Sequence, residues 1–317
     1  MDFVFKNKIK KYKDLDYIAC WFYKAAKYSS NFRSKVAFVS TNSICQGIQV
    51  SLLWPFIFDL DITIHFAVTT FKWSNNAKNQ AGVSCVIVGL SNAKKEFEKY
   101  IYQNNKIITT HNITPYLTSG SNIIVSPRNY VLSNFQEMIL GSAPKDNGGL
   151  LLDEVEKNDF VEKYPDYAFF IKKYIGADEF IYGKKRYCLY INDKDLDFAL
   201  SNPEIIKRLD ICFRMREKSK KNATRRLSVI PHKFGEDRYH DAESILIPAV
   251  SSESREYIPI GFIEKGSVIS NSAFALYEGQ VWLFGVMTSL MHMTWTRAVC
   301  GTLESRLRYS ARICYNN

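Results

Sequence analysis

Helix-like and strand-like apolar patterns alternate between residues 16 and 90, and this alternation constrains the fold more than any other feature of the chain. DLDYIACWFYKAAKYS has apolar residues at helical spacing behind an acidic start, and KVAFVST is a short apolar run rich in β-branched residues. QGIQVSLLWPFIF predicts a second helix that Pro55 kinks or ends, and ITIHFAVTTF and GVSCVIVGL predict two further strands. This part of the chain therefore predicts an α/β sheet.

The alternation stops after residue 92, where we place a domain boundary. SNAKKEFEKYIYQNN predicts a charged helix or helix-like connector, and extended chain follows it. Beyond residue 115 the chain has loops, short strands and two predicted helices, PEIIKRLDICFRMREKSKKNATRR and FGVMTSLMHMTWTRAVCG. A chain of 317 residues most naturally forms two domains. We therefore expect an α/β domain over 1–92, a connector over 93–114 and an α+β domain over 115–317.

Composition is that of a soluble globular protein, with 46% hydrophobic and 23% charged residues. The longest apolar stretch, VSLLWPFIF, is too short to span a bilayer, and no secretory signal is visible. The cysteines are odd in number and scattered without a CxxC pair, which predicts reduced core thiols in a cytoplasmic protein. They are Cys20, Cys45, Cys85, Cys188, Cys212, Cys300 and Cys314.

A net charge of +10 favours an anionic partner, although charge does not separate nucleic acid from an acidic membrane or from simple solubility. Basic residues cluster between residues 208 and 226 at the end of a predicted helix. Such a cluster is either a solvated helix face or a surface that contacts backbone phosphates. The candidate phosphate-binding residues are Arg214, Arg216, Lys218, Lys220, Lys221, Arg225, Arg226 and, from a later loop, Arg255.

Near the C-terminus the stretch TLESRLRYS places Glu304, Arg306 and Arg308 at alternate positions. In one continuous strand the three side chains point to the same side, because strand side chains alternate. The pattern is typical of a solvated strand face with internal ion pairing. It also suits an element that reads bases, since Arg pairs with the guanine edge and Glu accepts from the cytosine amine.

Signatures of catalysis and of metal binding are missing from the sequence. It has no Gly-rich phosphate loop, HExxH, GxSxG or paired-Cys motif, and its five histidines share no ligand spacing. His292 lies among methionines on an apolar helix, which favours core packing over a metal site. Phe71 and Trp73 stand at a polar loop between two strands, where they either fold back into the core or stack on an extruded base.

Several stretches, taken together and in order, resemble the MmeI-type restriction–modification enzymes. They are VAFVSTNSICQGIQVSLLWPFIF, ITIHFAVTTFKWSNNAKNQAGVSCVIVGL, YIPIGF, TSLMHMTWTRAVCG and RYSARICYNN, and they span nearly the whole chain. The resemblance implies a class I, Rossmann-like methyltransferase sheet of γ motif order, followed by an α+β target-recognition domain. Members methylate the N6 amine of adenine in a short DNA site and use S-adenosylmethionine.

The resemblance also implies roles for individual residues. Asp16 and Tyr17 begin the segment that resembles the helix near the cofactor's adenine, and the loop with Phe71 and Trp73 matches the one beside the flipped base. Glu304 and Arg306 would act as a pair on one base pair. Arg308 would act on another base pair together with a residue near Ser272.

Two motifs of that family are missing from this sequence: the Gly-rich cofactor motif and the Asn-Pro-Pro-aromatic tetrapeptide that polarises the adenine amine. We therefore expect the DNA-recognition portion of a larger bacterial enzyme, with no catalytic or metal-binding residue of its own, that neither methylates DNA nor holds S-adenosylmethionine by itself. Its expected partners are double-stranded DNA and either the missing methyltransferase half or a second copy, packed on a truncated sheet. One alternative is a complete, non-catalytic specificity subunit that joins a separate catalytic chain. A weaker alternative is a relative that acts on structured RNA. The narrow major groove of RNA argues against it, because the side chains of a strand cannot reach the base edges there.

Overall fold

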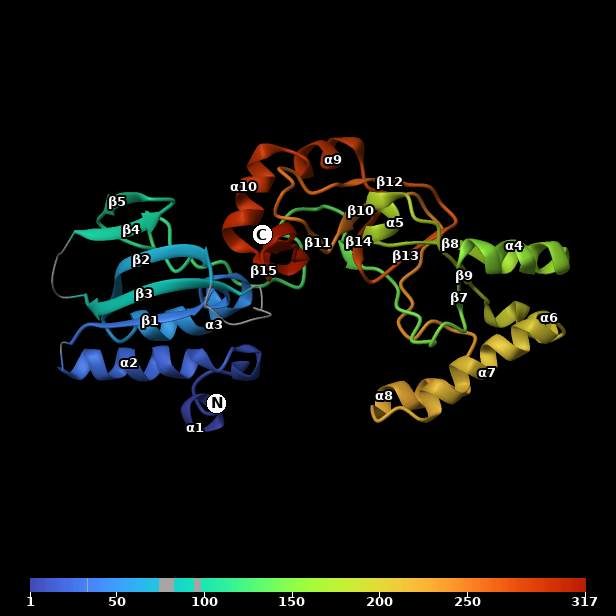
Figure 1. Cartoon of the computed structure of the whole chain (residues 1–317), viewed down its shortest axis with the longest axis horizontal. Helices are drawn as coiled ribbons and strands as arrows, with labels where there is room; N and C mark the ends of the chain where they lie inside the picture. Colours follow the sequence, from blue (N-terminus) through green and yellow to red (C-terminus); the bar gives the residue numbers. More distant parts are fainter. Residues whose placement is uncertain (33, 74–82, 94–97) are drawn as a thin grey trace. The chain divides into compact units, whose positions relative to one another are not determined.

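The computed structural model describes residues 1–32, 34–73, 83–93 and 98–317, which form two compact units (Figure 1). Unit 1 consists of Met1–Ser133, Ser251–Glu256 and Met291–Asn317, and unit 2 of Asn134–Val250 and Tyr257–Leu290. Unit 1 is thus assembled from both ends of the chain. As a result, the C-terminal TLESRLRYS segment belongs to the same unit as the α/β sheet.

Unit 1 contains the elements that the N-terminal patterns predict, with additional strands. Its helices are α1 (Asp2–Phe5), α2 (Ile18–Phe32), α3 (Gly47–Phe58) and α10 (Leu290–Val299). Its strands are β1 (Val36–Thr41), β2 (Ile62–Lys72), β3 (Ser84–Asn92), β4 (Lys99–Gln103), β5 (Lys106–Thr110), β11 (Val250–Ser251), β15 (Gly301–Leu303) and β16 (Arg306–Arg308).

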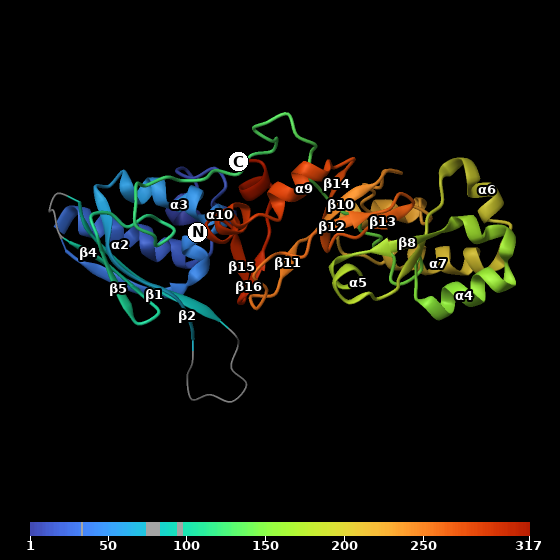
Figure 2. The ribbon, with the colours of Figure 1, turned by 90° about the horizontal axis from the view of Figure 1, so that it is seen from above.

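The main sheet of unit 1 has the strand order β1-β3-β2-β4-β5, antiparallel except for the β2–β4 pair. Helices α2 and α3 lie on one face of this sheet (Figure 2). The Phe38 ring of β1 meets Phe22 of α2 at a centroid distance of 5.0 Å, and Phe22 in turn meets the fully buried Trp54 of α3. These aromatic contacts form the core between the helices and the sheet, and the expected α/β class is confirmed.

Of the two outcomes predicted for Pro55, a kink or a helix end, the helix end is wrong. Helix α3 continues through Pro55 to Phe58, and the Asp59 amide donates to the Pro55 carbonyl at 2.9 Å. The helix predicted after residue 92 is also wrong for the part of that segment that the structure describes, since Lys99–Gln103 form strand β4, which is followed by β5. The Lys and Glu residues of SNAKKEFEKYIYQNN are typical of a solvent-exposed helix face, which explains the prediction. However, Asn104 and Asn105 both have positive φ and make a tight turn, which joins β4 and β5 as a hairpin.

Unit 2 is built on two four-stranded sheets, with orders β12-β10-β14-β6 and β13-β8-β9-β7. The strands are β6 (Ile139–Leu140), β7 (Leu151–Leu152), β8 (Ile171–Ile175), β9 (Tyr187–Leu189), β10 (Ser244–Pro248), β12 (Gly261–Ile263), β13 (Ser267–Ile269) and β14 (Ala273–Tyr277). The helices are α4 (Glu154–Lys163), α5 (Ala177–Tyr182), α6 (Leu196–Ala199), α7 (Pro203–Glu217), α8 (Asn222–Arg225) and α9 (Val281–Met287). The predicted helix over 284–301 is therefore two helices, α9 and α10.

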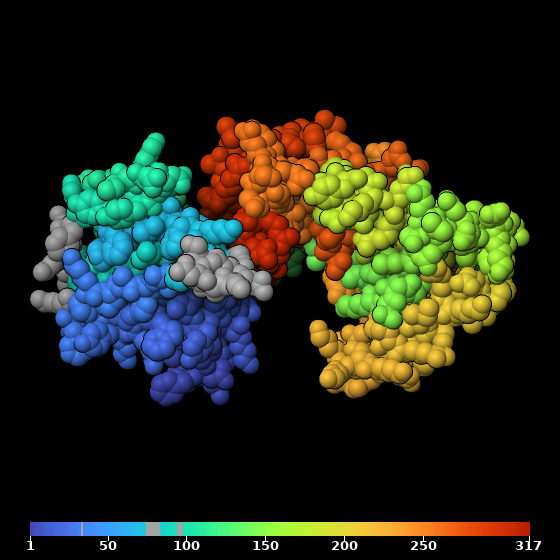
Figure 3. Space-filling model, in the orientation of Figure 1, coloured from blue at the N-terminus to red at the C-terminus, as the bar shows by residue number. Residues whose placement is uncertain are grey.

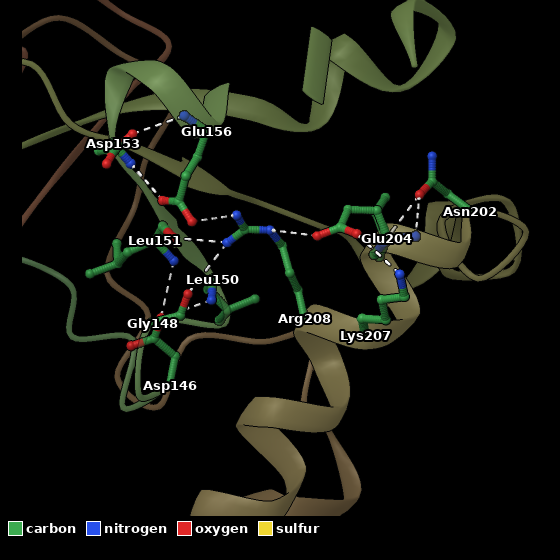
Figure 4. A network of polar contacts seen from close by, with 11 residues as sticks. Asp146, Gly148, Leu150, Leu151, Asp153, Glu156, Asn202, Glu204, Lys207 and Arg208 are labelled. Carbon is green, nitrogen blue, oxygen red and sulfur yellow. Dashed lines mark hydrogen bonds and ion pairs between the residues drawn. The ribbon is translucent and has the colours of Figure 1, made fainter. Parts of the chain in front are cut away.

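The start of α7 is joined to α4 through the buried Arg208 (Figure 4). Its guanidinium donates to Glu156 Oε1 at 2.8 Å and to the Leu151 carbonyl at 3.2 Å, and it pairs with Glu204 one helical turn earlier. Glu156 is itself fixed, because it closes a capping box with Asp153 at the start of α4. Arg208 is thus a structural arginine that holds two helices and strand β7 in one arrangement.

All seven cysteines are buried. No helix in the described ranges is long and apolar enough to cross a membrane. Nor do the residues that the structure describes contain a group of three or more His, Cys, Asp or Glu side chains that could hold a metal ion. His292 packs against Tyr309, with 3.0 Å between its Nε2 and the phenol oxygen.

Candidate nucleic-acid interface

The TLESRLRYS segment is a β-hairpin and not one continuous strand, which corrects the sequence prediction. Strand β15 ends at Leu303, Glu304 and Ser305 form the turn, and β16 begins at Arg306, which lies opposite Leu303. Glu304 has φ +59°, a left-handed conformation that side chains with a Cβ seldom adopt. Only Arg306 and Arg308 therefore share one strand face, and Glu304 reaches them from the turn.

Glu304 and Arg306 nevertheless form an ion pair at the tip of the hairpin. Arg306 Nη2 lies 3.0 Å from Glu304 Oε2, and the two side chains are 45% and 62% exposed. An exposed ion pair contributes little to stability, on the order of 0–1 kcal/mol. The pair therefore leaves both groups accessible while it limits the directions in which the guanidinium points.

Residues outside the hairpin hold its turn and its first strand. Ser305 Oγ donates to Glu253 Oε1 at 2.8 Å. A hydrogen bond from the backbone amide of Glu253 itself, and then this bond from Ser305, keep the pKa of the carboxyl below its usual value. Thr302 of β15 is hydrogen-bonded to Gln46 and Asn42, which follow β1. No local pattern in the sequence predicts these partners, because they lie far from the hairpin along the chain.

The basic cluster lies on α7, on α8 and on the turn between them, at the surface of unit 2 (yellow in Figure 3). Its exposed members are Arg214, Lys218, Lys220, Lys221, Arg225 and Arg226. Arg214 forms an ion pair with Asp210 at 2.7 Å, and Arg225 donates to Asn222. Arg255, in unit 1, is half-buried and lies two residues after Glu253, the partner of Ser305.

Arg216 does not belong to a phosphate-binding surface, which corrects the set proposed from the sequence. Its side chain is 0% exposed, and its guanidinium donates at 2.7–3.2 Å to five backbone carbonyls. These carbonyls belong to Pro144, Lys145, Leu227, Ile230 and Lys233. All of its donors are used inside the unit, so that none remains for a phosphate.

Phe71 and Trp73 lie at the end of β2, where residues 74–82 of the following loop are outside the described residues. Phe71 is half-buried and paired with Cys85 of β3, whereas Trp73 is 43% exposed and its amide donates to the Val83 carbonyl at 2.8 Å. Of the two rings, Trp73 is the more available for stacking.

The remaining candidate residues are Asp16, Tyr17 and Ser272, and two of them form hydrogen bonds with nearby elements. Asp16 Oδ2 accepts from Ser43 Oγ at 2.5 Å just before α2, and Tyr17 beside it is exposed. In unit 2, Ser272 Oγ accepts from the Ala177 amide at the start of α5. The proposed partnership of Ser272 with Arg308 joins two different units and stays a prediction.

Comparison with known proteins places these elements in a family. Residues 119–317 match the family described as the MmeI target recognition domain, and residues 1–103 match the MmeI DNA-methyltransferase domain. The chain belongs to the MmeI family. The resemblance inferred from the sequence blocks is thereby confirmed, and the hairpin lies within the region that matches the recognition domain.

Two relatives show how far the similarity extends. The chain is 45% identical over 310 residues to DNA methyltransferase A of Bacillus subtilis (strain 168), a match that covers 98% of this chain and 35% of that protein. It also matches the solved structure of the type IIL restriction–modification enzyme MmeI in complex with DNA. That match has a TM-score of 0.93 and 38% identity, and it covers 99% of this chain and 43% of the MmeI chain. The chain thus spans less than half the length of both relatives.

Proposed function

We propose that the chain is the DNA-recognising part of a site-specific adenine-N6 DNA methyltransferase of a restriction–modification system. The observation that carries this proposal is the exposed hairpin β15–β16, which presents Arg306 with the Glu304 carboxylate 3.0 Å away. Arg donates two bonds to guanine O6 and N7, and Glu accepts from the cytosine amine, so that the pair suits one C·G pair in the major groove. Arg308, on the same strand face, is available to a neighbouring base pair.

The exposed basic residues of α7 and α8 supply the part of the affinity that does not depend on sequence. Lys220 and Lys221 lie in the turn between these helices, and in this proposal they contact phosphates. Trp73 would stack on the adenine that is turned out of the duplex, and Phe71 would support it from the end of β2. We retain the division into a methyltransferase portion (1–92), a connector (93–114) and a recognition domain (115–317) as part of this proposal.

S-adenosylmethionine is the cofactor that the methyltransferase match suggests for the whole enzyme. Tyr17 offers an exposed ring and Asp16 a carboxylate held by Ser43, which suit the edge of an adenine group. The Gly-rich loop and the Asn-Pro-Pro-aromatic tetrapeptide are not in this sequence, so these residues do not make a complete cofactor site. We propose that the chain by itself transfers no methyl group, and transfer by the purified chain from labelled S-adenosylmethionine to DNA would contradict this.

Selection from a random DNA duplex library at moderate salt, followed by sequencing of the bound fraction, tests the recognition role. We expect enrichment of one short motif, because base contacts discriminate by about 1–3 kcal/mol each. Arg306→Ala should relax one position of that motif, whereas Lys220→Ala with Lys221→Ala should weaken binding to all sequences alike and reduce its salt dependence. Salt-dependent binding without any enriched motif would show that the chain does not read sequence by itself.

A further inference from the structure

The hairpin β15–β16 needs support from outside itself. Its strands have three residues each, and β16 also pairs with the two-residue strand β11, which leaves β15 at the edge of a small three-stranded sheet. Strands this short are marginally stable in water unless they pack against other elements. A bidentate contact to a base requires the guanidinium to be held within about 0.5 Å and 10–20° of its working position. Whatever fixes the hairpin therefore contributes to base reading.

Thr302, at the centre of β15, is held by two side chains from the segment between β1 and α3. Its amide and its hydroxyl both donate to Gln46 Oε1, at 3.1 and 3.3 Å. The same hydroxyl accepts from Asn42 Nδ2 at 3.2 Å. We call these three residues, Asn42, Gln46 and Thr302, the Thr302 clamp.

The backbone geometry brings the two segments close enough for this clamp. Gly47 has φ +53°, and a Cβ added to it would lie 3.7 Å from the Gly301 amide nitrogen. The start of α3 and the start of β15 are therefore adjacent at the level of their backbones. Asn42 is buried at this contact, where an unsatisfied amide is costly, so its bond to Thr302 also satisfies the asparagine.

The segment that carries the clamp is itself fixed to the core and to the start of α2. Trp54, fully buried in α3, donates from Nε1 to the Ile44 carbonyl at 2.8 Å. Ser43 donates to Asp16, which precedes α2. The hairpin is thus attached, through Asn42 and Gln46, to a segment of the methyltransferase portion that is hydrogen-bonded to the core.

We infer that Asn42 and Gln46 are positioning residues for base reading, which set the register of the hairpin against the methyltransferase sheet through Thr302. This inference rests on the proposed DNA recognition, and it assigns a role in specificity to two residues of the methyltransferase portion. The site read by Arg306 and the end of β2 that carries Trp73 are both in unit 1, so that a fixed hairpin gives a fixed spacing between the base read and the base extruded.

Hydrogen exchange of the free protein tests the clamp without any DNA. In Gln46→Leu the Thr302 amide and hydroxyl both lose their acceptor, and we expect the amides of residues 301–308 to exchange roughly tenfold faster. Gln46→Glu keeps the acceptor oxygen and should exchange like the parent protein. Ser51→Ala is the matched control, because Ser51 lies on α3, the helix that follows Gln46, and donates to the Ile48 carbonyl of that helix. Unchanged exchange in Gln46→Leu would overturn the clamp.

The duplex selection described above then tests its role in specificity. In Gln46→Leu we expect the preference at the position relaxed by Arg306→Ala to fall at least about tenfold, with an unchanged salt dependence. Gln46→Glu should restore that preference. An equal loss of binding to all sequences would overturn the positioning role. If the parent protein enriches no motif, the proposed function fails, while the exchange measurement still decides whether the clamp exists.

Discussion

At the scale of single residues, Arg214 and Arg216 show how burial decides the role of a charged side chain. They are two positions apart on α7, yet Arg214 forms an exposed pair with Asp210 while Arg216 donates to five carbonyls in the interior. We expect Arg216→Lys to lower the free energy of unfolding by at least about 3 kcal/mol, because an ammonium cannot reach carbonyls on several sides. Arg214→Lys should change it by less than about 0.5 kcal/mol. Urea unfolding of both variants measures the difference, and equal effects would contradict the assignment.

A second residue, Glu236, makes part of the stability of unit 2 dependent on pH. Hydrogen bonds from Lys145 and Arg238 hold the pKa of this carboxyl below its ordinary value of 4.5. A carboxyl whose pKa is lower in the folded state stabilises above its unfolded pKa, and this contribution is lost as pH falls through the folded pKa. Because the pair members are more than one-third exposed, the contribution is below about 1 kcal/mol.

The pH prediction concerns the difference in Tm between the parent protein and Glu236→Gln. The parent should be more stable between pH 6 and 7, and the difference should shrink as pH falls below 4.5 and be lost as pH falls through the lowered pKa of the folded state. Glu162→Gln, at an exposed position of α4, is the control and should show a smaller difference. A Glu236→Gln difference that is constant from pH 7 to pH 3 would show that the carboxylate charge is not involved.

At the scale of elements, the hairpin turn combines backbone strain with the side chain that faces Arg306. Glu304 has φ +59°, where glycine is favoured over any residue with a Cβ. We expect Glu304→Gly to leave the free energy of unfolding unchanged or to raise it by up to about 1 kcal/mol, since it removes the strain and only a weak ion pair. The same change should reduce the base preference at the position read by Arg306.

Glu278→Gly provides the matched control for the turn. Glu278 has φ +56° in unit 2, outside the hairpin. The variant Glu278→Gly should gain stability in the same way as Glu304→Gly, with no effect on base preference. Thermal unfolding and the duplex selection measure the two effects separately. A base preference that survives in Glu304→Gly would mean that Arg306 needs no carboxylate partner.

At the scale of the whole molecule, one face of the main sheet suits another chain. Val39, Ile87, Val68, Tyr102 and Ile107 lie opposite one another across the five strands, on the side away from the row of Phe38, which packs on α2. Val39, Tyr102 and Ile107 are exposed. Exposed apolar surface of this kind marks protein–protein contacts, and we propose that a second copy or a methyltransferase half packs here.

Sedimentation at rising concentration tests this proposal. We expect reversible self-association of the purified chain, and Ile107→Lys should weaken it at least about tenfold, because a buried unpaired ammonium is costly. Ile123→Lys is the control, since Ile123 is an exposed apolar residue of unit 1 outside the sheet. A monomer at all concentrations would leave a separate methyltransferase half as the partner, which co-purification with a chain that carries the missing motifs would detect.

The sequence by itself determined the elements whose burial follows local periodicity. Helix α2, strand β1 and strands β2 and β3 could be predicted, because each repeats its apolar residues with the period of its own secondary structure. The order of the distinctive sequence blocks was sufficient to identify the MmeI family. Glu304 and Arg306, the residues proposed to read bases, could also be chosen from the sequence, since the chemistry of their side chains toward bases does not depend on the surrounding fold.

Only the tertiary structure decided how those residues are held. The chain turns back at Glu304, so that the segment proposed to read bases is a hairpin, and no periodicity over so few residues predicts this. Arg216 has the same charge as its neighbours, and its burial depends on carbonyls from loops up to 72 residues away. Gln46 and Thr302 are 256 residues apart and come together only when both ends of the chain build unit 1. Local sequence patterns record local burial, whereas these contacts depend on segments that are brought together by the packing of the whole chain.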